Sequence, residues 1–198
     1  LPPGLSFNAI SQRALAAGES AKLPRSYWDW RPMLDANANF YFPYTPATNL
    51  LRGLQEAIAM LEEEGLPNVF ARHARHGAAT RAAVQAWGKA GGIEVQCLEP
   101  RDFSGSLTAV RLPEGTSADQ FRTLVLQRFN RSLGNGLGQL KDRVFRIGHL
   151  GDFNDLTLLG TIAGVEMGLR LAGVPHANGG VDAAMEVLAT KEMARAAA

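Results

Sequence analysis

The chain has 198 residues, 46% hydrophobic and 20% charged, which is the balance of a globular protein able to bury a hydrophobic core. Its 20 basic and 19 acidic residues leave a net charge of +1, which argues against nucleic acid or an anionic membrane as a partner. Cys97 is the only cysteine, which excludes an intrachain disulfide. The sequence contains no run of about 18 apolar residues, so no membrane span is predicted.

Residues 1–48 show no clear hydrophobic period and are rich in proline, glycine and aromatic side chains. A short helix over residues 12–17 is the regular element expected there. Such a long irregular stretch is unusual at the start of an independent domain, so we expect it to pack on structure encoded upstream. The opening phrase Leu1-Pro2-Pro3-Gly4, which has no initiator methionine, also predicts a chain cut from a longer polypeptide.

Helical periodicity begins sharply after this stretch. Apolar residues predict a helix over 50–61, with Thr48 or Asn49 as its N-cap and Gly65 at its end. The change of pattern places a domain boundary near Gly65. A second helix is expected over residues 68–87, and its possible inward positions include Phe70, Ala74, Ala78 and Val84.

The rest of the chain mixes strands and helices. The expected elements are strands over 93–98, 107–112 and 144–149 and helices over 118–129, 156–171 and 181–195. Ser117 and Gln120 match a capping box, and Asn154 or Asp155 can cap the next helix. The glycine-rich residues 133–138 lack the lysine and serine of a phosphate-binding loop, so a flexible turn is expected. Because strands and helices do not alternate strictly, the order predicts a small, mainly antiparallel sheet covered by helices.

Arg146 is the first candidate for a binding site. It interrupts an otherwise apolar strand, and a buried charge is costly unless it is paired. One interpretation is a planar fork that holds a carboxylate of a ligand, with Gly148 leaving room for the ligand's approach. The alternatives are an ion pair with Asp142 or Asp152, or a side chain that simply faces solvent.

Residues 41–49 form the second candidate. Two prolines stiffen a loop that presents the hydroxyls of Tyr41, Tyr44 and Thr45 just before a helix N-terminus, an arrangement suited to phosphate. The alternative is that Thr48 only caps the helix and the tyrosines pack.

The remaining polar residues predict no further site. His73, His76, His149 and His176 match no metal-binding motif. His149 alternates with Phe145 and Ile147 on the strand face opposite Arg146, so a structural role is expected. No serine-hydrolase motif is present, and Cys97 lies in an apolar strand typical of a core residue.

Taken in order, several phrases resemble the serine–glyoxylate and alanine–glyoxylate aminotransferases, which are class V members of the fold-type I pyridoxal-phosphate enzymes. These phrases are residues 1–8 (LPPGLSFN), 41–46 (YFPYTP), 64–73 (EGLPNVFARH), 144–151 (VFRIGHLG) and 164–167 (GVEM). The resemblance covers nearly the whole chain. Residues 43–46 and His149 are more similar to the serine–glyoxylate branch than to the animal alanine–glyoxylate enzymes.

The resemblance implies an α/β and α+β architecture. Residues 1–64 would be the C-terminal remainder of the large cofactor-binding domain, and residues 65–198 the small C-terminal domain. Arg146 would hold the α-carboxylate of the substrate. Thr45, aided by Tyr41, would reach the phosphate of the cofactor in the neighbouring subunit of a homodimer; the tyrosine that the family places three positions before this threonine is Phe42 here.

The activity that the resemblance implies is transamination with pyridoxal 5'-phosphate from L-serine to glyoxylate, by a cytoplasmic enzyme whose partners are small amino and keto acids. Its catalytic lysine is expected a few residues before Leu1, so no catalytic residue is assigned in this segment and the segment alone is not expected to be active. Lys22, Lys89, Lys141 and Lys191 are the lysines present, and none lies in the matching phrase.

The sequence is also compatible with two other functional interpretations. One is a related class V enzyme such as a cysteine desulfurase, for which Cys97 in its apolar strand is a poor candidate. The other is a non-catalytic α+β module in which Arg146 binds a small carboxylate.

Overall fold

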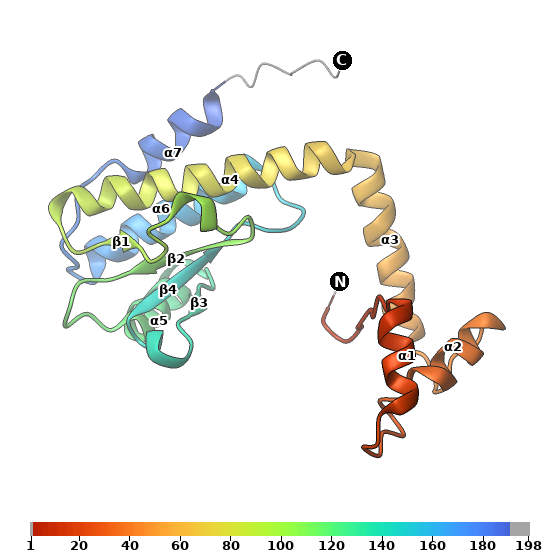
Figure 1. The fold of residues 1–198 in the computed structure, drawn as a ribbon. Coiled ribbons are helices and arrows are strands. Elements are labelled where there is room, and N and C mark those ends of the chain that lie inside the picture. The colour runs from red at the N-terminus through yellow and green to blue at the C-terminus, as the bar shows by residue number, and fades with distance from the viewer. Residues whose placement is uncertain (1, 191–198) are drawn as a thin grey trace. The chain divides into compact units, whose positions relative to one another are not determined.

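The computed structural model describes residues 2–190, and the chain divides into two compact units, Leu1–Gly65 and Leu66–Ala198. Figure 1 shows the elements of each unit. Within residues 2–190, no helix is both long and apolar enough to cross a membrane.

The first unit contains three helices, α1 (Gln12–Ser20), α2 (Trp30–Ala38) and α3 (Thr48–Glu64). Side chains cap the first two: Ser11 Oγ accepts from the Ala14 N–H at 3.2 Å, and Asp29 accepts from the Arg31 N–H at 3.2 Å. The expected cap of α3 is wrong. Thr48 already belongs to the helix, and Ala47 at the N-cap position offers no side-chain acceptor.

The first unit has no hydrophobic core of its own. None of residues 2–65 is buried, and several aromatic side chains are almost fully exposed, including Trp28 (78%), Tyr41 (75%) and Phe40 (97%). Burial of apolar surface is the main favourable term in folding, so this unit lacks the interaction that would stabilise it alone.

The second unit is an antiparallel sheet with helices packed on it. Its elements are α4 (Leu66–Trp87), β1 (Glu94–Val95), β2 (Leu107–Arg111), α5 (Ala118–Phe129), β3 (Gly134–Asn135), β4 (Val144–Gly148), α6 (Asp155–Leu171) and α7 (Gly180–Ala189), with short 3₁₀ turns at Gly88–Ala90, Pro100–Asp102 and Gly138–Leu140. The strand order is β1-β2-β4-β3, and each neighbouring pair is antiparallel. The prediction of a small antiparallel sheet covered by helices is confirmed.

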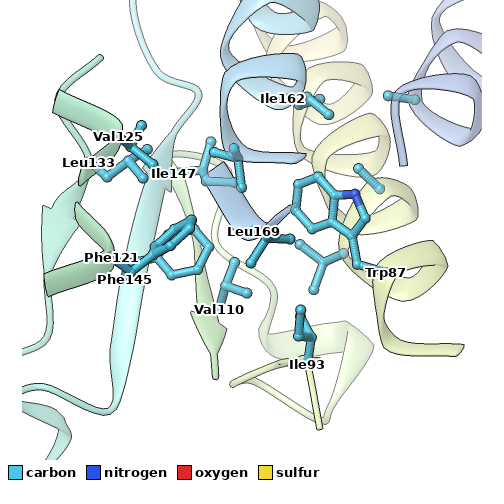
Figure 2. Packing of buried hydrophobic residues seen from close by; sticks show 14 of the residues in the cluster. Trp87, Ile93, Val110, Phe121, Val125, Leu133, Phe145, Ile147, Ile162 and Leu169 are labelled. Carbon is cyan, nitrogen blue, oxygen red and sulfur yellow. The ribbon is translucent and has the colours of Figure 1, made fainter. Parts of the chain in front are cut away.

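The register of the central strands places four buried side chains on one face of the sheet, which is the core face. Thr108 lies opposite Ile147 and Val110 lies opposite Phe145, and all four are buried. The ring of Phe121 on α5 packs against Phe145, with 4.9 Å between centroids (Figure 2). Because side chains alternate along a strand, Arg146 projects from the opposite face of the sheet.

A buried carboxylate ties three helices of this unit together. Glu166 on α6, 7% exposed, accepts from Trp87 Nε1 of α4 at 3.0 Å and from the Val181 N–H at the start of α7 at 3.1 Å. Gly180 permits this approach, because a Cβ atom there would lie only 2.0 Å from Trp87 Nε1. Trp87 itself lies in the main core (Figure 2).

Helix predictions hold best in this unit. The helix over 118–129 is confirmed, with Ser117 as its cap, and α6 begins after Asn154, whose side chain accepts from the Thr157 N–H. The last helix begins one residue early and ends at Ala189, and the remainder of the helix predicted over 181–195 lies from residue 191 onward outside the described part of the chain.

Other expectations are corrected. The strand over 93–98 shortens to Glu94–Val95, which pair with Val110 and Arg111 of β2. The glycine-rich turn contains the short strand β3, because its backbone pairs with β4. Phe70 and Ala74 were expected to point inward but are exposed, and α4 contributes other residues to the core.

His149, just beyond β4, is a fully buried histidine, as the alternation with Phe145 and Ile147 predicted. Its Nε2 lies 3.0 Å from Thr108 Oγ1, and its Nδ1 is buried without a partner. Burial lowers the pKa of His149 from 6.5 to about 4, so the ring is neutral in the folded protein at physiological pH.

The lowered pKa of His149 predicts that the folded protein loses stability in mild acid. Because the pKa of His149 is lower in the folded state than in the unfolded state, its contribution is fully present above pH 6.5 and is lost as the pH falls towards 4. The loss is on the order of 2–3 kcal/mol. Denaturant unfolding of the full-length gene product at pH 6.5 and 4.5 measures it, and His149→Gln should reduce the difference.

A comparison of the two proteins at pH 7.5, where the wild-type ring is neutral, isolates the packing cost of the substitution. His76, whose pKa is also lowered by burial, accounts for part of the slope that stays in the variant. Equal acid sensitivity of wild type and variant would show that His149 does not carry the effect.

Candidate functional site

Arg146 lies in the middle of β4, on the face opposite the core, and its side chain is half-buried. Its two cross-strand neighbours are small: Ala109 of β2 and Gly134 of β3 both lie in register with it. The Nε atom of Arg146 is buried and has no hydrogen-bond partner. Among residues 2–190, no carboxylate forms an ion pair with this guanidinium.

The carboxylates proposed as alternative partners are engaged elsewhere or exposed. Asp142 Oδ1 accepts from Ser117 Oγ at 2.6 Å and from the Asp119 N–H at 2.9 Å, and these bonds lower the pKa of Asp142. Asp142 therefore completes the cap of α5. Asp152 lies exposed in the loop after β4. Arg146 is thus a half-buried cation, and neither Asp142 nor Asp152 supplies its counter-charge.

The loop that follows β4 is fixed to α4 through the backbone of Gly151. Arg72 Nη1 donates to the Gly151 carbonyl at 2.7 Å, and His73 Nε2 accepts from the Gly151 N–H at 3.0 Å. The other ring nitrogen of His73 lies 2.6 Å from the Val69 carbonyl, which assigns the proton to Nδ1. These contacts attach the loop that follows β4, and therefore the end of the strand that carries Arg146, to α4.

A second cluster anchors the start of α6. Asp155 receives two hydrogen bonds from Arg75, at 2.8 and 3.0 Å, and its Oδ1 lies 2.8 Å from His76 Nε2. Phe153 stacks on the His76 ring at 4.9 Å. His73 and His76 thus hold two different segments, and residues 2–190 contain no group of three side chains that could hold a metal ion.

Thr45 and Tyr41 lie in the first unit, in the segment that leads into α3. Both side chains are exposed, and the hydroxyl of Thr45 has no partner among the described residues. The first turn of α3 has no side-chain cap either. Exposed hydroxyls beside an uncapped helix N-terminus form a surface that can accept an anion. The predicted site residues therefore belong to two separate units.

Sequence reasoning missed the contact of Gly134 with Arg146 and the anchoring of the loop after β4. Gly134 was assigned to a flexible turn, and His73 was considered only as a residue that matches no metal-binding motif. Gly134 pairs with Arg146 on the neighbouring strand, and the partner of Arg72 and His73 is Gly151, 78 or more positions away, so no local pattern announces these contacts. The sequence signal that could have found the contact with Arg146 is Gly134 itself, because a glycine inside a strand often marks a site where another group approaches the backbone closely.

Comparison with known proteins now adds to this geometry. No family model matches the chain. A serine–glyoxylate aminotransferase of Methylorubrum extorquens is 46% identical over 202 residues, which cover 99% of this chain and 49% of that protein. An L-aspartate–glyoxylate aminotransferase of Paracoccus denitrificans is 42% identical over 187 residues, which cover 94% of this chain and 46% of that protein.

A solved structure of similar fold is the pyridoxamine–pyruvate aminotransferase from Mesorhizobium loti, with a TM-score of 0.78 and 29% identity over 90% of this chain and 46% of that one. The chain spans about half the length of the curated relatives it matches. On this evidence the chain is similar to the C-terminal portion of class V, fold-type I aminotransferases of the serine–glyoxylate and alanine–glyoxylate group.

Proposed function

We propose that the protein is a pyridoxal-phosphate-dependent aminotransferase that moves the amino group of L-serine to glyoxylate. The observation that carries the proposal is Arg146, a half-buried cation without a carboxylate partner among residues 2–190, on a chain similar to serine–glyoxylate aminotransferases. The two substrates share an α-carboxylate. One arginine in a fixed position can therefore bind both in turn.

The bound cofactor would supply the carrier for the amino group and the electron sink for deprotonation at Cα. The contribution of this chain is to bind and orient. Arg146 would hold the carboxylate of the amino acid and then that of the keto acid. On the sheet face around Arg146, its cross-strand neighbours are the small residues Ala109 and Gly134.

We further propose that residues 1–64 complete a large cofactor-binding domain and that residues 65–198 form the small domain. The lack of any buried residue in positions 2–65 supports this, since such a segment needs further apolar surface to pack against. A homodimer in which Thr45 and Tyr41 reach the partner subunit's cofactor phosphate is consistent with their exposure. The residues present fit a phosphate, because hydroxyls and uncapped backbone N–H groups are suitable donors.

The phosphate contact predicts a change in cofactor retention. Removing both hydroxyls, in Thr45→Val combined with Tyr41→Phe, should weaken binding of pyridoxal phosphate by about 100-fold or more, because each of the two lost hydrogen bonds to a charged group costs about 1.5–3 kcal/mol. Equilibrium dialysis of the full-length gene product measures this. Tyr27→Phe, at another exposed tyrosine of the same unit, is the control. Unchanged retention in the double variant would remove these residues from the site.

The proposed reaction predicts a spectral change in the full-length gene product. The protein should carry an absorbance band near ~410–430 nm that moves to ~330 nm on addition of L-serine and returns on addition of glyoxylate. L-aspartate and pyridoxamine, the donors named for relatives, are tested in parallel to fix the preference. A full-length protein that stays colourless with pyridoxal phosphate would overturn the proposed activity.

The role of Arg146 predicts a carboxylate-specific defect. Arg146→Ala should lower kcat/KM for L-serine by about 10²–10³-fold, since truncating one partner of a buried charge pair costs several kcal/mol. The reaction with ethanolamine, which is serine without its carboxylate, should change little. Arg143→Ala, at an exposed arginine three residues earlier, is the matched control. Equal losses with both amines would show that Arg146 acts structurally.

A further inference from the structure

Gly134 has no conformational reason to be a glycine. Its φ angle lies outside the positive range, whereas Gly138 nearby adopts +54°. Glycine weakens a strand relative to other residues because it loses more backbone freedom and packs no side chain. The position therefore needs another explanation, and the neighbours of Gly134 provide it.

The space above Gly134 is filled by Arg146. The two residues are in register on β3 and β4, which lie side by side in Figure 1. A Cβ atom on Gly134 would lie 3.0 Å from Arg146 Cβ, 3.0 Å from its Nε and 3.4 Å from its Cζ. The arginine side chain therefore runs across the bare backbone of β3 as far as its guanidinium carbon.

This contact fixes the direction of the Arg146 side chain, as ion pairs do for other arginines of the second unit. Arg75 is held by two bonds to Asp155, and Arg122 by bonds to Asp119 and the Leu133 carbonyl. Arg146 has no carboxylate partner among residues 2–190, and its Nε is buried without a bond. Its direction is thus set by packing between the strands, with Gly134 on one side and Ala109 on the other.

We propose that Gly134 is a positioning residue for the substrate carboxylate, because its missing side chain lets Arg146 lie flat across β3 and present its fork in one direction. The inference rests on the proposed role of Arg146. A methyl group at this position would lie 3.0 Å from Cβ and from Nε of Arg146, so the arginine side chain must shift by a few tenths of an ångström away from β3. Two-point recognition of a carboxylate depends on that direction.

The experiment measures binding of 3-hydroxypropionate, which is serine without its amino group and cannot be transaminated, to the full-length gene product by calorimetry. Gly134→Ala should weaken this binding on the order of tenfold, equivalent to ~1.4 kcal/mol of lost interaction. Gly105→Ala is the matched control, since that glycine has open space and an ordinary backbone conformation. Its affinity should equal that of the wild type.

The loss of binding caused by Gly134→Ala must also depend on the presence of Arg146. In an Arg146→Ala background, Gly134→Ala should cause no further loss of binding, because the group it displaces is absent. In the active enzyme, Gly134→Ala should raise KM for L-serine while the rate with ethanolamine is unchanged. Rates with the two amines that fall together, or an equal loss of 3-hydroxypropionate binding in both backgrounds, would overturn the inference.

The proposed function and this inference fail in different ways. A wild-type protein that binds 3-hydroxypropionate through Arg146 and Gly134 but shows no spectral change with L-serine would refute the transaminase while supporting the positioning role. A transaminase whose carboxylate affinity is unchanged by Gly134→Ala would refute the positioning role alone. A crystal structure of Gly134→Ala should show the guanidinium displaced from its wild-type position.

Discussion

The second unit depends on one buried carboxylate. Glu166 joins α6 to the indole of Trp87 on α4 and to the backbone N–H groups of Gly179 and Val181 at the start of α7. Burial pushes the pKa of Glu166 up, but these hydrogen bonds and the charge of Arg170 outweigh burial and leave the pKa below its usual value. A charged group satisfied in this way is costly to disturb, so it fixes how the three helices meet.

That arrangement determines where the sheet can lie. Trp87 at the end of α4 and Leu169 on α6 enter the same core as Phe145 and Ile147 of β4. Because alternate residues of a strand face opposite ways, burial of Phe145 and Ile147 leaves Arg146 on the opposite face of the sheet. The position of the candidate substrate arginine is therefore a consequence of helix packing on the far side of the sheet.

The sequence was informative where a local pattern decides the structure. Ser117 and Asn154 mark the starts of α5 and α6 by chemistry that acts within a few residues, and the alternation through β4 assigns Arg146 and His149 to opposite faces. It was uninformative where the partner is distant. The pairing of Gly134 with Arg146 and the anchoring of Gly151 by His73 depend on the assembled sheet, and β1 ends at Val95 although apolar residues continue.

The two units differ in what the chain itself can satisfy. In the second unit, polar groups such as Glu166 and Asp155 find partners within residues 66–190 and the apolar residues share one core. In the first, aromatic side chains and the start of α3 are left exposed. Arg146 combines both conditions: packing fixes its direction, yet its charge has no carboxylate partner among residues 2–190. A group held rigidly while its charge stays unpaired binds an anion without first breaking an internal ion pair, and this makes it effective for small carboxylates.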